Sequence, residues 1–277
     1  MMVQTIDMSV DYGKMGLPAP SQAPTLTTYL LDKQPREDTV RPLRPAVIVC
    51  PGGAYAMTCS REGEPVALRY CAAGFHSFVL NYSCAPVGWP AAACELSKAI
   101  AYVRSIADDY GIDKDKIIVC GFSAGGHLTA SIGVYWDNPM IQDLSGVVGE
   151  ENRPNGLVLC YPVILDDPAE SNIDTIRNFI GENEENRKWF GLDKRVTAAT
   201  PPAFLWHTVA DKGVPVACSM KFADALRKCG VPFEMHLYPD GAHGLSLADE
   251  TTSTDESQLH PEITGWMQLS IDWINRL

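Results

Sequence analysis

Residues 117–128 read Ile117-Ile118-Val119-Cys120-Gly121-Phe122-Ser123-Ala124-Gly125-Gly126-His127-Leu128. An apolar run rich in β-branched residues breaks at Gly-x-Ser-x-Gly and continues into a sequence typical of a helix. A serine at the apex of so tight a turn has a strained backbone, and only small residues two positions away let the strand and the helix pass closely. Gly121 and Gly125 meet that need, so we predict that Ser123 is a nucleophile at the positive end of a helix.

Short apolar runs alternate with helical patterns on both sides of this turn. We predict further strands at residues 46–50, 77–82, 157–160, 203–206 and 233–238. This alternation indicates a single α/β domain over residues 1–277, with a doubly wound, mainly parallel sheet and helices on both faces. Residues 1–45 read as an irregular N-terminal extension with one strand-like stretch at 25–31. Residues 166–200 read as a small, polar cap insertion over the serine, because long insertions in a compact domain are usually functional.

Composition and charge limit the partners. The 277 residues are 46% hydrophobic and carry a net charge of −12, which argues against nucleic acid and anionic membranes as partners. The nine cysteines lack CxxC spacing and read as small buried hydrophobic residues in a reducing compartment. With no signal-like or membrane-length apolar segment, we expect a soluble, cytoplasmic protein with no metal and no cofactor. We expect a small neutral substrate; the sequence leaves open whether the chain forms a homo-oligomer.

A serine hydroxyl becomes a nucleophile when an imidazole takes its proton, and a carboxylate must orient that imidazole. His243 is the best placed of six histidines, because it lies in a glycine-flanked loop after the last predicted strand. Asp211 follows a buried strand and precedes a helix, which gives the chain order Ser, Asp, His. Rival candidates for the carboxylate are Asp240, Asp166 and Asp167, whereas His127 and His207 read as structural or supporting residues.

Acyl transfer also needs N–H donors for the oxyanion, each worth roughly 3 kcal/mol. The sequence predicts one donor at Gly53 or Ala54, directly after the first buried strand, and the other at Ala124, the residue after the serine. An alanine at position 54 keeps this geometry if its φ is negative. Two further residues are candidates for contact with substrate, Tyr55 and Glu62; alternatively, Arg61 and Glu62 hold the oxyanion loop in place.

Several of these motifs resemble bacterial esterases of the α/β-hydrolase superfamily, in the acetylxylan esterase-like group of the esterase and lipase families. They are Pro51-Gly52-Gly53-Ala54-Tyr55, Gly121 to Leu128, Asp211 before Val214-Pro215, and Gly241-Ala242-His243-Gly244. The resemblance covers about residues 45–277 and implies a triad of Ser123, Asp211 and His243. The chain departs from the family pattern at Pro51 and Ala54, where lipases have His and Gly, and at Ser83-Cys84, where Arg-Leu is usual.

From the residues and the resemblance we expect a serine esterase that removes short acyl groups, above all acetyl, from carbohydrate esters such as xylo-oligosaccharides. A general short-chain carboxylesterase or lipase is the alternative with the same chemistry, although the charged insertion counts against long acyl chains. A serine peptidase of this fold would carry a large extra domain. A catalytically inactive hydrolase-fold binding protein would normally lack a triad residue, and none is missing here.

Overall fold

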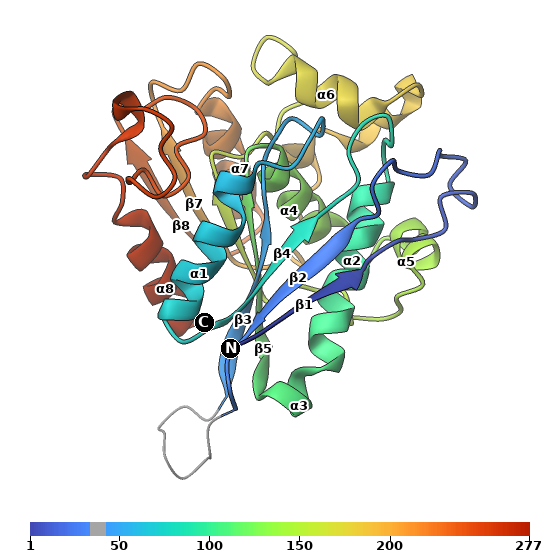
Figure 1. The fold of residues 1–277 in the computed structure, drawn as a ribbon. Helices are drawn as coiled ribbons and strands as arrows, with labels where there is room; N and C mark the ends of the chain where they lie inside the picture. The colour runs from blue at the N-terminus through green and yellow to red at the C-terminus, as the bar shows by residue number, and fades with distance from the viewer. Residues whose placement is uncertain (34–42) are drawn as a thin grey trace.

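The computed structural model describes residues 1–33 and 43–277, which form one eight-stranded sheet (Figure 1). The strand order is β1-β2-β4-β3-β5-β6-β7-β8. All pairs from β4 to β8 are parallel, and β2 pairs antiparallel with both β1 and β4. The strands are β1 (Met2–Asp7), β2 (Thr25–Leu30), β3 (Arg44–Cys50), β4 (His76–Asn81), β5 (Ile112–Phe122), β6 (Gly156–Cys160), β7 (Ala203–Thr208) and β8 (Phe233–Tyr238). The predicted doubly wound, mainly parallel sheet is therefore confirmed.

Helices cover both faces of the sheet. The helices and 3-10 turns are η2 (Ser60–Glu62), α1 (Glu64–Ala72), α2 (Ala91–Ser105), α3 (Ala107–Tyr110), α4 (Ala124–Tyr135), α5 (Pro139–Ser145), α6 (Ile173–Ile180), η3 (Glu184–Trp189), η4 (Leu192–Lys194), α7 (Ala217–Lys228), η5 (Glu256–Gln258) and α8 (Trp266–Arg276). Side chains of α2, α4 and α7 pack on one face, and those of α1 and α8 pack on the other. Among the residues that the structure describes, no helix combines the length and the apolar character needed to cross a bilayer.

Alternate residues of the central strands belong to the two separate cores. Ile48 and Val119 face the α2, α4 and α7 side, whereas Val47 and Ile118 face α1 and α8. This follows from the two-residue period of a strand. Because both faces are covered, the buried parts of the central strands β3, β5, β6 and β7 are apolar on both sides, which is why continuous apolar runs marked them in the sequence.

The N-terminal part is more regular than expected. We predicted one strand-like stretch, but β1 also forms and pairs with β2 from Met2 opposite Leu30 to Asp7 opposite Thr25. Five of its six residues are exposed, so the strand lacks the apolar pattern on which the prediction relied. It is an edge strand, and its pairing with the backbone of β2, rather than burial of its side chains, holds it in the sheet.

The segment between β6 and β7 contains α6, η3 and η4, and α6 lies beyond the carboxyl ends of the strands in Figure 1. Asn178 on α6 donates to the carbonyl of Ala54 at 2.8 Å, and Asn172, which caps the helix, donates to the carbonyl of Gly213 at 3.1 Å. These two contacts bring the segment against the loops that follow β3 and β7.

Candidate active site

The turn between β5 and α4 has the geometry predicted for it. Ser123 has φ +52 and ψ −115, a strained conformation for a non-glycine residue. A Cβ on Gly121 would lie 2.1 Å from the carbonyl oxygen of Gly125, and a Cβ on Gly125 would lie 2.0 Å from that of Cys50. Both positions therefore require glycine, and the close approach that they allow places Ser123 at the start of α4.

The structure brings together the three residues proposed for proton transfer. Ser123 Oγ lies 2.8 Å from His243 Nε2, and His243 Nδ1 lies 2.7 Å from Asp211 Oδ2. The other carboxylate oxygen, Asp211 Oδ1, accepts from the backbone N–H groups of Gly213 at 2.8 Å and Val214 at 2.9 Å. Because Asp211 requires a proton on Nδ1, Nε2 is left as the acceptor that faces the serine hydroxyl.

Asp211 is held in its ionised form. Burial alone would raise its pKa, but hydrogen bonds from His207 and His243 outweigh burial and bring the pKa well below the ordinary value. His207 Nε2 lies 3.3 Å from Asp211 Oδ2, and its Nδ1 contacts Ser219 Oγ at 2.8 Å. His207 thus supports the carboxylate rather than the serine. Of the rival acids, Asp166 pairs with Lys194 at 2.6 Å and Asp167 accepts from the N–H of Ala169.

Ser123 and His243 open into a cleft of about 320 Å³, which is also lined by Gly53, Ala54, Asn172 and Thr175. The two candidate residues for the first oxyanion donor, Gly53 and Ala54, therefore line the same cleft as the serine. The N–H of Ala124 belongs to the first turn of α4, where helices leave their amides without an intrahelical acceptor.

The condition set above for Ala54, a negative φ, is not met. The structure gives φ +54, and the next residue, Tyr55, also has a positive φ of +56. At Gly53, φ is +129 and a Cβ would lie 2.2 Å from the carbonyl oxygen of Met57. The tight loop, rather than the residue type at position 54, therefore sets the direction of these amides, and alanine is tolerated in a left-handed conformation.

Tyr55, predicted as a substrate contact, is not among the residues that line the cleft. The side chain is 4% exposed, and its hydroxyl lies 2.9 Å from Nδ1 of His127. The other nitrogen of His127 lies 3.0 Å from the carbonyl oxygen of Phe190, and burial lowers the pKa of this histidine to about 3. Tyr55 and the neutral His127 are therefore packing partners below the loop, in agreement with the structural interpretation of His127.

Glu62 borders the cleft but is 3% exposed, and both of its oxygens are engaged. Oε2 accepts from the N–H of Gly52 at 2.7 Å, and Oε1 accepts from the hydroxyl of Tyr161 at 2.6 Å. Of the two roles expected for Glu62, this arrangement fits the one in which it holds the oxyanion loop in place.

Sequence reasoning missed Tyr161. It follows the last residue of β6, has a positive φ of +38, and packs its ring edge-on to the imidazole of His243 with the centroids 5.1 Å apart. The one available signal was its position directly after a buried strand, at the edge of the sheet where sites of α/β proteins form.

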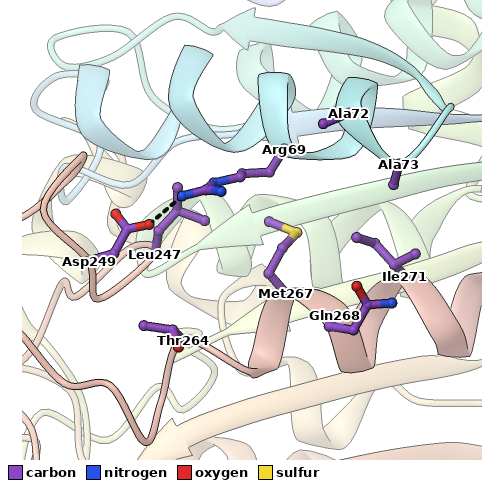
Figure 2. A pocket seen from close by; sticks show the side chains of 9 residues that line it. All are labelled: Arg69, Ala72, Ala73, Leu247, Asp249, Thr264, Met267, Gln268 and Ile271. Atoms are coloured by element: carbon purple, nitrogen blue, oxygen red, sulfur yellow. Dashed lines mark hydrogen bonds and ion pairs between the residues drawn. The ribbon is translucent and has the colours of Figure 1, made fainter.

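A larger hollow of about 540 Å³ lies between α1 and α8, away from these residues (Figure 2). Arg69 on α1 reaches across it to Asp249, with 2.7 Å between Nη2 and Oδ2, and Met267 and Ile271 of α8 line the opposite wall. Its charged groups neutralise each other, and neither Ser123 nor His243 lines it.

Comparison with curated proteins identifies relatives whose names refer to xylan or to its acetyl esters. Endo-1,4-beta-xylanase B of Butyrivibrio fibrisolvens is 37% identical over 82% of this chain and 35% of its own length. Acetylxylan esterase of Xylanibacter ruminicola is 29% identical over 80% of this chain and 45% of its own length. The chain thus spans less than half of the length of each of these two relatives.

A solved structure matches over nearly the whole chain. The acetyl ester-xyloside bifunctional hydrolase of Caldicellulosiruptor lactoaceticus is 33% identical with a TM-score of 0.81, covering 99% of this chain and 96% of that one. MGS-M1, an alpha/beta hydrolase enzyme from a Medee basin deep-sea metagenome library, is 29% identical with a TM-score of 0.77, covering 100% of this chain and 97% of that one. Together with the sheet order, this second match confirms the α/β-hydrolase fold. The family model described as BD-FAE matches residues 34–226, and because this is well over half of the sequence, the chain belongs to the BD-FAE family.

Proposed function

We propose that the chain is a serine carboxylic-ester hydrolase that removes short acyl groups, principally acetyl, from carbohydrate esters such as xylo-oligosaccharides. The observation that carries the proposal is the hydrogen-bonded series from Ser123 through His243 to Asp211, at 2.8 and 2.7 Å, beside a cleft. A buried, ionised aspartate on an imidazole that contacts a strained serine is the arrangement that activates a hydroxyl nucleophile.

In the proposed reaction, Ser123 Oγ attacks the ester carbonyl carbon while His243 Nε2 takes the hydroxyl proton. The negative charge on the carbonyl oxygen is met by the N–H of Ala124 and by that of Gly53 or Ala54. When the tetrahedral intermediate collapses, the bond between the acyl carbon and the sugar oxygen breaks, and His243 gives its proton to that oxygen, which leaves as the sugar hydroxyl. Water then attacks the acyl-serine with His243 as base, and acetate leaves as the serine regains its proton.

The choice of substrate class rests on two supports. The relatives named above are a xylanase, an acetylxylan esterase and an acetyl ester-xyloside hydrolase. The cleft is also small, about 320 Å³, and polar side chains of Asn172 and Thr175 border it, which suits a short acyl group on a sugar better than a long aliphatic chain. A general short-chain carboxylesterase is the second candidate, because the same cleft would accept a simple acetate ester.

We also propose that the segment at residues 166–200 is a cap on a single catalytic domain, because α6 contacts the loop of Ala54, and Thr175 of α6 and its N-cap Asn172 line the cleft. The nine free thiols favour a reducing, cytoplasmic compartment.

The test compares Ser123→Ala with Ser131→Ala as the matched control. Ser123 caps α4, and Ser131 is a buried serine within the same helix whose hydroxyl contacts His127. We expect Ser123→Ala to lower kcat on p-nitrophenyl acetate by on the order of 10⁴ or more, and Ser131→Ala to leave it within about threefold. Acetate release from acetylated xylo-oligosaccharides, set against acetyl, butyryl and octanoyl esters of p-nitrophenol, decides the substrate class. Rates that rise with chain length would overturn the acetyl assignment, and normal activity in Ser123→Ala would overturn the nucleophile.

A further inference from the structure

We propose that residues 60–62, the 3-10 turn η2, join the two loops of the active site, with Arg61, Glu62 and Tyr161 as positioning residues. The oxyanion loop is residues 51–57, and the histidine loop is residues 239–247. The inference rests on the proposed function, because it concerns the placement of groups that act in that reaction.

The inner connection is a series of hydrogen bonds through buried atoms. The N–H of Gly52 in the oxyanion loop donates to Glu62 at 2.7 Å, and the hydroxyl of Tyr161 donates to the same carboxylate at 2.6 Å. The N–H of Ser246 in the histidine loop donates to the Tyr161 hydroxyl oxygen at 2.9 Å. One carboxylate and one phenol therefore link the backbones of the two loops.

The donor directions in this series fit the ionised form of Glu62. Backbone N–H groups can only donate, so Ser246 supplies a hydrogen to the Tyr161 oxygen. Tyr161 in turn donates its own hydrogen to Glu62. Gly52 likewise directs its hydrogen at the second carboxylate oxygen. A glutamine at position 62 would offer one acceptor and one NH₂ group. The NH₂ group would face either the N–H of Gly52, which can only donate, or the hydroxyl of Tyr161, which would then have to turn its hydrogen away from residue 62.

The outer connection is made by the neighbouring residue. Arg61 donates from Nη2 to the carbonyl of Gly244 at 3.2 Å and from Nη1 to the carbonyl of Thr252 at 2.7 Å. The hydroxyl of Ser246 donates to the backbone carbonyl of Arg61 at 2.8 Å. The turn thus contacts the histidine loop through a side chain and through its backbone, on both sides of Leu245.

The oxyanion loop and Tyr161 both pack against the groups proposed to react. A Cβ on Gly52 would lie 2.8 Å from the carbonyl oxygen of Phe122 and 3.0 Å from Cβ of Ser123, so this loop packs directly on the nucleophile turn. The ring of Tyr161 packs edge-on to His243, at 5.1 Å between centroids and 71° between planes. A change at Glu62 would therefore shift the oxyanion amides and the imidazole relative to each other, and misplacement by about 1 Å can cost 10²-fold in rate.

The experiment compares Glu62→Gln, Tyr161→Phe and the double variant with Glu95→Gln as the matched control. Glu95 is another buried carboxylate that accepts from a backbone N–H and a tyrosine hydroxyl, those of Ser83 and Tyr12, and it does not line the cleft. We expect Glu62→Gln to lower kcat on p-nitrophenyl acetate by about 10- to 100-fold with KM within about threefold. The double variant should be no worse than about threefold below Glu62→Gln, since both changes break one series of bonds, and Glu95→Gln should keep kcat.

A rise in KM at unchanged kcat would make Glu62 a substrate contact, and an unchanged kcat in folded Glu62→Gln and Tyr161→Phe would exclude positioning; either result overturns the inference. If Glu62→Gln does not fold, Tyr161→Phe, which removes a single oxygen, decides in its place. Hydrogen exchange in peptides covering residues 51–57 and 239–247 is read in parallel. It should accelerate in Glu62→Gln and not in Glu95→Gln, and this readout judges the connection even if the wild-type chain hydrolyses no ester and the proposed function fails.

Discussion

Two buried glutamates share their local chemistry but lie in different regions of the molecule. Glu62 and Glu95 each accept a backbone N–H at 2.7 Å and a tyrosine hydroxyl, and burial raises the pKa of both. The partners of Glu62 belong to the loops around the nucleophile, whereas Ser83 and Tyr12, the partners of Glu95, join the N-terminal segment to the residues after β4. We infer that a buried glutamate can affect the reaction only if the groups that donate hydrogen bonds to it belong to the active-site loops. Burial of the carboxylate alone does not decide this.

The largest effect expected in this comparison comes from a third buried carboxylate, that of Asp211. The loss of kcat on its removal sets an upper limit for the loss expected at Glu62. Asp211→Asn keeps the packing but no longer fixes the tautomer of His243, so we expect kcat to fall by about 10³- to 10⁴-fold. Steady-state kinetics on p-nitrophenyl acetate measures the loss. Asp240→Asn, in the same loop as His243, is the control and should keep kcat; a greater loss there than in Asp211→Asn would assign the acid to Asp240.

The next prediction changes the side chain of the residue whose backbone N–H donates to each glutamate. Gly52→Ala introduces a Cβ that would lie 2.8 Å from Oε2 of Glu62 and 3.0 Å from Cβ of Ser123, so both must shift. We expect kcat to fall by about 10²-fold. At the other site, Ser83→Ala removes a hydroxyl that donates to Glu95 at 2.5 Å. It should cost about 1.5–3 kcal/mol of stability in urea unfolding without a change in kcat; equal kinetic losses in the two variants would end the contrast between the regions.

The parts of this site that could be predicted from sequence are those fixed by local geometry. Gly121, Gly125 and Ser123 define the nucleophile turn because a tight turn between strand and helix dictates its own residue types. His243 and Asp211 could be predicted because parallel strands bring the loops after them to one edge of the sheet. Chain order and strand pattern carry that information directly.

What could not be predicted depends on contacts distant in sequence. Glu62 and Tyr161 are 99 positions apart, and neither has a local pattern that marks its partner. Tyr55 follows a glycine pair at the predicted oxyanion loop, but its side chain turns into the core to reach His127, a choice made by the space below the loop. The strand β1 was missed because its exposed residues carry no apolar period, and Ala54 shows that a closed loop can impose a positive φ on an alanine.

The smallest predicted effect concerns stability and applies to both glutamates alike. Burial is the main cause that raises the pKa of Glu95 above 4.5, against the hydrogen bonds from Ser83 and Tyr12. The folded chain therefore binds a proton more readily than the unfolded chain does, and its stability must fall as the pH rises from the unfolded pKa through the folded one. Glutamine does not titrate, so the free energy of unfolding of the wild type should fall relative to that of Glu95→Gln over this window, by at most about 1.4 kcal/mol per pH unit. Below the window the difference should be constant, because both chains are then neutral at this position.

Urea unfolding of the wild type, Glu95→Gln and Glu62→Gln at a series of pH values measures these differences. Both variants should show the same sign, because burial raises the pKa at both sites. A difference that grows in favour of the wild type with rising pH would mean that the donors outweigh burial, as they do at Asp211. The two stability differences can agree in sign while kcat falls in Glu62→Gln alone. In that case, a pKa shift in the same direction at both glutamates goes together with an effect on the reaction at only one of them. The reason is that Gly52 and Ser246 belong to the oxyanion and histidine loops, whereas Ser83 belongs to neither.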